Sequence, residues 1–296
     1  NYLHLKEGDS SREEVEMKRK NLMLAKTFSL LPAIGNAYYN KWKNNIRTYD
    51  VFHPSSFGGC LRKVAYQYYD VDVGDSAFDE KGQRIFDCGH YMHFRYKDIF
   101  KEAHELWGYW KCKNPLCNLI QGDNEKRGIP FSKVVTCKCG NNTGINGFEY
   151  EEVLAEDKEY NFSGHVDAIV RAGDGYEPDD FIIVDFKTIN SNGFNLLTSP
   201  KHVHCVQVAI YMHILNISHS VLFYEDKDKQ LIKEFRVDYD KKVAENIMET
   251  AKKLLEILKS NKIPPRPYQN KENSYDCKYC EYSKICWKSS KLNSST

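Results

Sequence analysis

Two short segments of the chain carry the residue types that metal-dependent hydrolysis uses. Phe162-Ser-Gly-His-Val-Asp167 precedes Ile182-Ile-Val-Asp185-Phe-Lys187. Side chains two apart in a strand face the same side, so we expect Asp185 and Lys187 to project together. A hairpin between the two segments brings Asp167 beside Asp185. Two neighbouring carboxylates are best tolerated when they hold a divalent cation, and a nearby lysine stabilises charge that develops on a phosphate.

Two further groups accompany these carboxylates. His93, in Gly89-His-Tyr-Met-His93, falls on a predicted helix and can supply a third metal ligand. Gln207 and Tyr211 are four residues apart, so they share one helix face. Taken singly these features are weak, because Asp-x-Lys pairs are common and a lone histidine is more often structural. Their order along the chain makes the set informative.

Four cysteines form a group in turn-rich sequence, as Cys112-x4-Cys117 and Cys137-x-Cys139. In a chain expected to be intracellular, such spacing indicates metal ligation rather than disulfides. Four thiolates fit a closed tetrahedral Zn2+ site. Two unrelated pairs of thiols are the alternative. Basic residues in this segment either contact a phosphate backbone or form a solvated surface, and the sequence does not separate these possibilities.

A second group of cysteines closes the chain as Cys277-x-x-Cys280-x5-Cys286. Three closely spaced thiolates need a fourth ligand, and Cys60 is the natural candidate. A link from Cys60 to this segment closes a very long loop, so a structural benefit is plausible. The spacing alone does not distinguish an iron–sulfur cluster from a four-cysteine Zn2+ site. Cys88 and Cys205 remain, and we expect both to be buried thiols.

Composition limits the class of protein. The chain has 296 residues, of which 41% are hydrophobic and 28% charged, and its net charge is 42 − 41 = +1. These values favour a soluble globular protein and exclude a uniformly basic nucleic-acid coat, but not a local basic groove. No apolar run is long enough for a membrane helix, and no secretion signal is evident at the N-terminus, so we expect a cytoplasmic (intracellular) protein.

Periodicity and capping signals predict the elements that position these residues. Helices are expected over 11–47 with an interruption at Pro32 and Gly35, and over 60–69, 84–106, 202–215 and 240–258. Strands are expected within 149–190, and over 221–224 and 231–237. Asp240 is expected to cap the last helix, and Val243 to lie on its apolar stripe. Residues 52–56 and 70–83 are expected to be loops.

With these motifs in place, the chain resembles the RecB-like branch of the PD-(D/E)XK nuclease superfamily. The resemblance covers about residues 52–106 and 149–288. It rests on Gly89-x-x-x-His93, Gly164-x-x-Asp167, Val184-Asp-Phe-Lys-Thr188 and Gln207-x-x-x-Tyr211. As an ordered set these motifs are fairly specific.

The resemblance implies a role for each motif residue. The residues that would bind Mg2+ or Mn2+ are His93, Asp167, Asp185 and the backbone carbonyl of Phe186. Lys187 takes the catalytic role in phosphodiester hydrolysis. Gln207 and Tyr211 take supporting roles, directed either towards the bound DNA or towards the lysine. One position departs from the family, which often has an acid four residues after the histidine. Here that position is Lys97, followed by Asp98.

One N-terminal cysteine joined to three at the C-terminus resembles the iron–sulfur nucleases, including CRISPR-associated exonucleases of the Cas-four type and the AddB nuclease domain. The resemblance therefore favours a [4Fe–4S] cluster on Cys60, Cys277, Cys280 and Cys286. Aromatic and basic residues are interleaved around positions 62–69 and 91–97. Such a mixture can stack bases of a single strand, although aromatic residues at helical spacing more often form a core.

The predicted fold is α/β, a restriction-endonuclease-like core with a central mixed sheet flanked by helices. The expected parts are an N-terminal helical region (1–50), a nuclease core (51–106 and 146–262), a zinc insert (107–145), an iron–sulfur segment with Cys60 (263–288) and a tail (289–296). The implied function is a Mg2+- or Mn2+-dependent DNA exonuclease that prefers single-stranded ends. The alternative is a non-catalytic DNA-binding or scaffold subunit of a recombination or CRISPR-adaptation complex. No phosphate-loop motif is present, so any helicase partner would be a separate protein.

Overall fold

The computed structural model describes residues 30–44, 49–74, 79–103, 106–139, 147–171, 181–268 and 274–288. The chain divides into two compact units, one of residues 1–46 with 78–85 and one of residues 47–77 with 86–296. The first unit contains α2 (Leu31–Lys43) and the first turn of α5 (Glu80–Ala103). Of the helices expected over 11–47, the structure describes α2: Pro32 lies in its first turn, as a helix start allows, but α2 passes through Gly35 unbroken, so the interruption expected there is wrong. Residues 11–29 and the tail from residue 289 lie outside the described residues. Among the described helices, none has the length and apolar character needed to cross a membrane.

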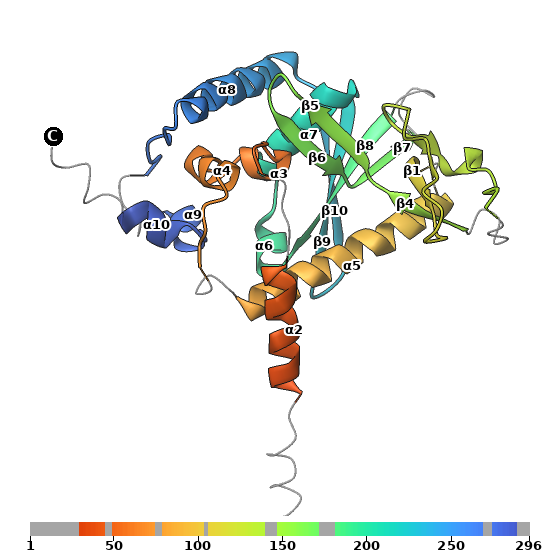
Figure 1. The fold of residues 1–296 in the computed structure, drawn as a ribbon, viewed down its shortest axis with the longest axis horizontal. Helices are drawn as coiled ribbons and strands as arrows, with labels where there is room; N and C mark the ends of the chain where they lie inside the picture. The colour runs from red at the N-terminus through yellow and green to blue at the C-terminus, as the bar shows by residue number, and fades with distance from the viewer. Residues whose placement is uncertain are drawn as a thin grey trace, which may run out of the picture. The chain divides into compact units, whose positions relative to one another are not determined.

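The second unit is built on a mixed sheet in the order β10-β9-β8-β7-β1-β2, with β3 and β4 also paired to β1 (Figure 1). Its strands are β1 (Trp107–Cys112), β2 (Ile120–Gln121), β3 (Ile129–Pro130), β4 (Phe148–Glu151), β7 (Ala168–Arg171), β8 (Phe181–Ile189), β9 (His219–Asp226) and β10 (Ile232–Asp238). Strands β8 and β9 are parallel, whereas β7 and β10 run antiparallel to their neighbours. A separate antiparallel hairpin joins β5 (Val153–Asp157) to β6 (Phe162–Val166).

The helices of this unit besides α5 are α3 (Pro54–Phe57), α4 (Leu61–Tyr68), α6 (Ser191–Leu196), α7 (His202–Leu215), α8 (Lys241–Lys259), α9 (Tyr275–Lys278) and α10 (Ser283–Lys288). The central mixed sheet flanked by helices is the predicted fold class. The loop expected over residues 52–56 is wrong, because α3 begins inside it at Pro54. Pro54 occupies the first turn of that helix, where proline costs no hydrogen bond, and Phe57 is buried.

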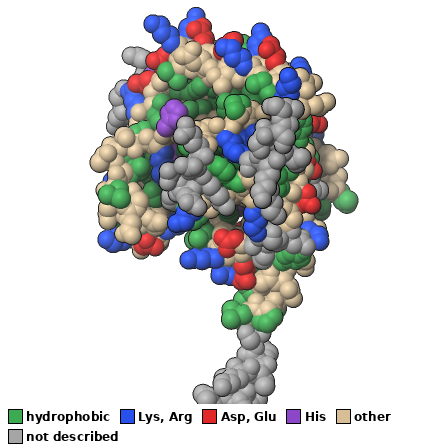
Figure 2. All heavy atoms as spheres, turned by 90° about the vertical axis from the view of Figure 1, so that its left-hand side faces the viewer, with side chains coloured by type: hydrophobic (Ala, Val, Ile, Leu, Met, Phe, Trp, Pro, Cys, Tyr) green, Lys and Arg blue, Asp and Glu red, His purple; other side chains and the backbone are tan. Residues whose placement is uncertain are grey.

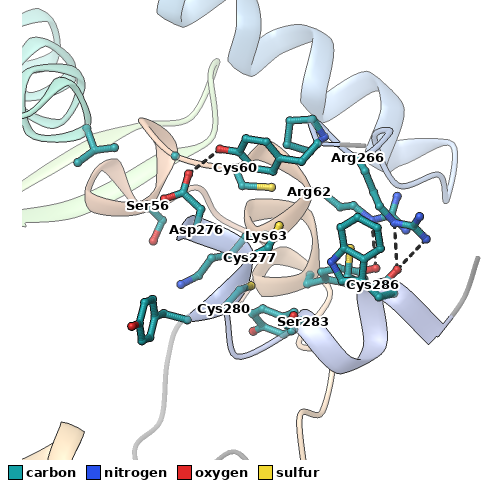
Figure 3. Close-up of a pocket in the computed structure, with 18 of the residues that line it drawn as sticks. Ser56, Cys60, Arg62, Lys63, Arg266, Asp276, Cys277, Cys280, Ser283 and Cys286 are labelled. Atoms are coloured by element: carbon teal, nitrogen blue, oxygen red, sulfur yellow. Dashed lines mark hydrogen bonds between the residues drawn. The ribbon is translucent and has the colours of Figure 1, made fainter. Parts of the chain in front are cut away.

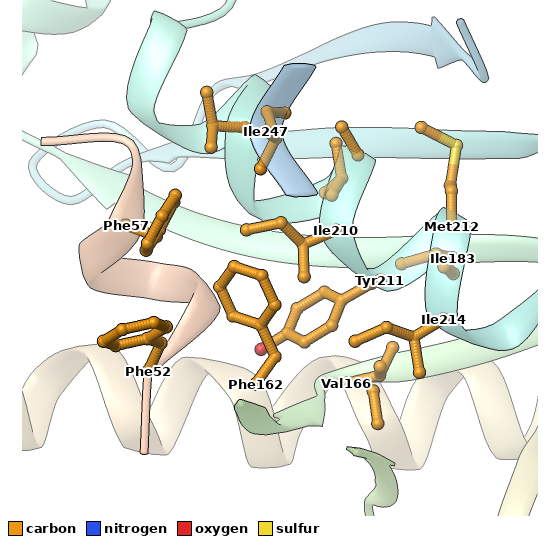
Figure 4. Packing of buried hydrophobic residues seen from close by; sticks show 14 of the residues in the cluster. Phe52, Phe57, Phe162, Val166, Ile183, Ile210, Tyr211, Met212, Ile214 and Ile247 are labelled. Atoms are coloured by element: carbon orange, nitrogen blue, oxygen red, sulfur yellow. The ribbon is translucent and has the colours of Figure 1, made fainter. Parts of the chain in front are cut away.

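Helices cover both faces of β8, which explains its continuous apolar sequence. Ile183 and Ile189 face the core beneath α7, whereas Val184 and Phe186 face the core beneath α5. On the α7 side, aromatic rings from α3 and β6 meet the buried residues of α7 (Figure 4). The strand that carries Asp185 and Lys187 is therefore held rigidly between two packed layers.

Helix α8 packs against α7 and α4, and Asp240 caps it as predicted by accepting hydrogen bonds from Lys242 N at 2.8 Å and Val243 N at 3.1 Å. The prediction that Val243 lies on the buried stripe is wrong. Val243 is 48% exposed because it lies in the first turn, before the packed residues begin at Ala244. Basic and acidic side chains alternate along the outer surface of α8, at the top of Figure 2.

The range 107–145 differs from the separate insert that the sequence suggests. Strand β1 pairs with β7 through Trp107 and Ile169, and with β4 through four residue pairs. Trp110 is fully buried among residues of the main sheet and α5. The cysteine-bearing loops thus extend from a strand of the central sheet, and no change of composition marks that pairing in the sequence.

Candidate active site and cysteine centres

The junction between β6 and β7 places Asp167 beside the middle of β8. Strands β7 and β8 pair so that Ala168 lies opposite Val184, and Phe186 N–H donates to Asp167 Oδ2 at 2.9 Å. Asp185 and Lys187 project from the same side of β8. The Lys187 Nζ atom lies 2.5 Å from Asp185 Oδ2. The paired strands thus bring together the two carboxylates and the lysine that the sequence singles out.

Asp185 is a buried carboxylate whose hydrogen-bonding capacity is not satisfied. It is 1% exposed, and apart from the Lys187 ammonium beside Oδ2, neither carboxylate oxygen has a hydrogen-bond donor among the described residues. Burial raises the pKa of Asp185 to about 6; the Lys187 charge acts to lower it, and the Asp167 charge raises it further. A buried, unsatisfied carboxylate is costly for folding. Such a group fits a cation that supplies the missing interactions.

Asp167 forms a second pair in the site, with His93 of α5. The His93 Nδ1 atom lies 3.3 Å from Asp167 Oδ1. Burial acts to raise the pKa of Asp167, but His93, Lys187 and the Phe186 N–H lower it to about 2. Burial likewise opposes protonation of His93, yet Asp167 raises the pKa of His93 above its usual value. The environment therefore shifts the pKa values of the two acids in opposite directions.

Helix α7 presents Gln207 and Tyr211 as buried neighbours on one face. Tyr211 donates a hydrogen bond to the His165 carbonyl at 2.8 Å, and burial raises the pKa of Tyr211 strongly. The motif glycine has a steric explanation here. A Cβ on Gly164 would lie 2.8 Å from Pro54 Cδ and 3.0 Å from the Tyr211 hydroxyl. Glycine at 164 therefore permits the close approach that holds β6 against α7.

Two nearby residues, Glu152 and His204, are not identified by the sequence patterns. Lys97, at the position where the family often has an acid, is itself buried and forms an ion pair with Glu152, whose side chain is 30% exposed. His204 Nδ1 lies 2.7 Å from the Tyr224 hydroxyl, and burial together with the charge of Lys187 lowers the pKa of His204 to about 3. Glu152 and His204 belong to no motif, so only their positions in the folded chain reveal them.

The cysteines on β1 and the loops that follow it converge on one point. Sγ atoms lie 3.6 Å apart for Cys112 and Cys139, and 3.5 Å apart for Cys117 and Cys137. All four sulfurs fall within 4.8 Å of one another. A tetrahedral Zn2+ ion with bonds of about 2.3 Å holds its sulfurs about 3.8 Å apart. The first predicted ligand set is thus assembled with the spacing of a single ion.

The protonation of this cluster also fits a cation. The Cys139 backbone N–H lowers the pKa of Cys137, but the surrounding sulfurs raise it to about 12. Four thiolates this close repel one another strongly unless a positive ion binds them. The glycine that follows the last of these cysteines lies outside the described residues.

The second cysteine group lines a cavity of about 320 Å³. Figure 3 shows Cys60, at the start of α4, and Cys277 and Cys280, from α9 and the turn after it, directed towards a common space, with Cys286 from α10 at its side. Arg266 closes the wall by donating to the Cys286 carbonyl at 2.8 Å. Among the described residues, only the first group has four sulfurs within 4.8 Å, so the second group is more widely spaced.

The two remaining cysteines differ from each other. Cys205 is partly buried on α7, against the core. Cys88 is exposed, so the expectation that it is a buried thiol is wrong.

Comparison with known proteins gives one family match and several similar structures. A family model described as the PD-(D/E)XK nuclease superfamily matches residues 65–287. The crystal structure of SSO0001 is similar, with 15% identity, a TM-score of 0.47, and coverage of 88% of this chain and 96% of that one. The structure of LHK-Exo in complex with dAMP has 12% identity, a TM-score of 0.39, and coverage of 72% and 89%. A further structure of LHK-Exo, an alkaline exonuclease from Laribacter hongkongensis, has 16% identity, a TM-score of 0.27, and coverage of 38% and 60%. No curated protein sequence matches the chain.

Proposed function

Because the chain belongs to the PD-(D/E)XK nuclease superfamily, we propose that it is a Mg2+- or Mn2+-dependent DNA exonuclease that prefers single-stranded ends. The observation that carries this proposal is the Asp185 carboxylate. It is buried in an ion pair with Lys187 and near a second acid, and neither of its oxygens accepts a hydrogen bond from any other described residue. A carboxylate that serves only the fold would be satisfied by donors.

The residues that would hold the divalent ion are His93, Asp167, Asp185 and the carbonyl of Phe186. Carboxylate, carbonyl and imidazole donors at one buried point suit Mg2+ or Mn2+. When bound, the ion lowers the pKa of an attacking water and neutralises the scissile phosphate. The Phe186 N–H and His93 hold the Asp167 carboxylate in place, which keeps one ligand fixed and ionised.

Lys187 would act on the phosphate that is cleaved. Its ammonium group is held beside Asp185, and the charges of Asp185 and Asp167 raise its pKa against the effect of burial. A charged lysine at this point stabilises negative charge that develops during hydrolysis. Gln207 and Tyr211 would support the site from α7, Tyr211 through its bond to the His165 carbonyl beside the motif strand.

We propose different metals for the two cysteine centres. Zn2+ suits Cys112, Cys117, Cys137 and Cys139, because their sulfurs have the separation of ligands to one ion. A [4Fe–4S] cluster suits Cys60, Cys277, Cys280 and Cys286, because the irons of a cluster hold its thiolates farther apart than one ion does. Thiolate centres of this kind agree with a reducing cytoplasm.

The decisive experiment compares cleavage of end-labelled single-stranded and duplex DNA with and without Mg2+ or Mn2+, using protein purified without oxygen. Lys187→Met should lower the rate about 100-fold or more, because it removes one electrostatic stabiliser of the transition state. The matched control is Lys241→Met, which removes an exposed lysine whose side chain is 78% accessible on α8. Circular dichroism would verify that both variants fold.

Metal-dependent digestion that is lost in the Lys187 variant and kept in the control would support the exonuclease. Products released from labelled ends would distinguish an exonuclease from an endonuclease. DNA binding without cleavage by metal-loaded protein would instead favour the non-catalytic scaffold. In that case a recombination, helicase or CRISPR-adaptation partner would be sought. Cleavage unaffected in the Lys187 variant would contradict the assigned site.

A further inference from the structure

Helix α5 carries two adjacent rows of side chains on the flank that holds His93. The inner row is His93, Lys97 and Lys101, and the outer row is Phe86, His90 and Phe94. Within each row the spacing is four residues, which places successive side chains one above the other along a helix. All six positions belong to the second unit of the chain, which also contains Asp167 and Asp185.

Contacts between the rows fix the outer row next to the candidate active site. The rings of His90 and His93 have centroids 6.4 Å apart, and His93 itself contacts Asp167. The Lys97 Nζ atom lies 5.8 Å from the centroid of the Phe94 ring. A chain that binds across the outer row therefore continues directly into the acidic site.

The outer row is open to solvent, with the exposed His90 between two exposed phenylalanines. Phe86 is 67% exposed and Phe94 is 64% exposed, while Tyr96 of the same helix is buried in the core. The structure thus divides the aromatic residues of this helix into two sets. One set packs beneath α5, and the other leaves ring faces available for contact with a ligand. Exposed phenylalanines in a row beside a polar site mark a binding surface.

The charge beside the row suits a phosphate backbone. Lys101 continues the inner row, with its Nζ 4.1 Å from the centroid of the Phe131 ring. No carboxylate lies within ion-pairing distance of Lys101 in the part of the chain that the structure describes. Lys97 is already paired with Glu152, so of the two lysines in these rows Lys101 is the one whose charge is available to a phosphate.

The spacing of the rings selects single-stranded over duplex nucleic acid. Residues four apart on a helix are about 6 Å apart along its axis. Bases stacked within a strand of duplex DNA are about 3.4 Å apart and are also paired. Only bases that are unstacked and unpaired can each lie on a separate ring, because every base has a face that stacks on an aromatic side chain.

We propose that Phe86, His90 and Phe94 bind successive bases of the DNA single strand whose end lies at the acidic site, with Lys101 contacting its backbone. This inference rests on the proposed nuclease function. It adds the element that selects single strands, since the acids and Lys187 contact only the reacting phosphate, which both forms of DNA share. The row is a binding surface, and its residues take no part in hydrolysis.

The test measures binding and cleavage separately. Fluorescence anisotropy with a labelled single strand and a labelled duplex, in Mg2+-free buffer, would compare wild type with Phe94→Ala. The Kd for the single strand should rise roughly 5- to 150-fold, the range for loss of one base–aromatic stack, while the Kd for the duplex stays unchanged. The matched control is Ile99→Ala, since Ile99 is 49% exposed on the same helix but off both rows.

Two further comparisons separate stacking from a general loss of surface. Phe94→Trp should bind the single strand at least as tightly as wild type. An oligonucleotide with abasic sites near its end should bind wild type more weakly, and lose little more in Phe94→Ala, because both changes remove the same stack. Equal losses in the Phe94 and Ile99 variants, or equal losses on single strand and duplex, would overturn the proposal. So would tighter binding of single-stranded RNA than of DNA.

Cleavage kinetics distinguish failure of this inference from failure of the proposed function. If the wild type cleaves DNA, Phe94→Ala should raise KM for the single strand with little change in kcat, as expected for lost ground-state binding. Cleavage with unchanged KM and Kd in Phe94→Ala would overturn the binding role of the outer row but leave the nuclease assignment intact. Selective single-strand binding that depends on Phe94, without cleavage by the wild type, would refute the proposed nuclease function and support the binding role of the outer row.

Discussion

Asp185→Asn should make the protein more stable at pH 7 in buffer without added Mg2+, although it abolishes cleavage. The pKa of Asp185 is about 6 in the folded protein, against 3.8 for an unperturbed aspartate. The difference, 6 − 3.8, is about 2 units, and at about 1.36 kcal/mol per unit it corresponds to about 3 kcal/mol. That is the cost of ionising this carboxylate in the fold, after the attraction of Lys187 has been included.

The sign follows from proton binding. Because the folded protein holds the Asp185 proton more tightly than the unfolded chain, its stability falls as pH rises from about 4 to about 6 and stays low above that. Asparagine removes the charge, so the expected gain is largest at pH 7 and small at pH 4. We expect about 2 kcal/mol rather than 3, since the amide N–H groups of asparagine introduce new unsatisfied donors.

The assay is urea unfolding followed by circular dichroism at pH 4.5, 6 and 7.5, with thermal unfolding in parallel. A gain of about 2 kcal/mol corresponds to a rise in Tm of roughly 4–8 °C. Added Mg2+ should raise the Tm of the wild type and leave that of Asp185→Asn almost unchanged, because binding to the folded state alone stabilises it.

Asp167→Asn is the control with the opposite expectation. The pKa of Asp167 falls from 3.8 to about 2 on folding, so its ionised form stabilises the protein above pH 4 and loses this contribution as pH falls through about 2. Its replacement should cost about 2 kcal/mol at pH 7. If Asp185→Asn were less stable than the wild type at pH 7, the carboxylate would serve the fold, and our argument for a cation at this point would be wrong.

Three further predictions concern the other centres and the motif glycines. Cys137→Ser should lower the Zn2+ content measured by mass spectrometry by one ion per chain, whereas Cys280→Ser should remove iron, acid-labile sulfide and visible absorbance and leave Zn2+ in place; a loss of the same metal in both variants would contradict two separate centres. Gly164→Ala should destabilise the protein by about 1–3 kcal/mol, because the added Cβ meets Pro54 and the Tyr211 hydroxyl. Gly89→Ala should instead add about 0.5–1 kcal/mol of stability, since its Cβ makes only an ordinary contact of 3.6 Å to Thr188 and alanine favours a helix interior. Denaturant titration measures both changes, and a Gly89→Ala variant less stable than Gly164→Ala would contradict this explanation.

Local sequence patterns predicted most of the fold because they act over short distances. The continuous apolar run of β8, the capping of α8 by Asp240 and the apolar residues of α7 are each visible within one short segment of the sequence. The boundaries of α7 agree with the structure, and α5 begins four residues earlier than predicted. The pairing of β1 with β7 could not be predicted, because strand pairing depends on contacts between distant segments that leave no periodic signal.

The candidate site shows the same division. The types and order of His93, Asp167, Asp185 and Lys187 are legible in the sequence, because each chemistry requires those side chains. Their protonation is not legible, since two aspartates of the same type acquire pKa values of about 2 and about 6 from burial and from the groups that surround them.

The sequence by itself thus determined which residues can perform chemistry and which family the motifs resemble. Only the tertiary structure decided that one set of four cysteines lies within the reach of a single ion, and that a wider set lines a cavity. It also decided that Phe94 faces solvent while Tyr96, two residues later, is buried. Distance and exposure are properties of the whole packed chain, because each depends on elements far away in sequence.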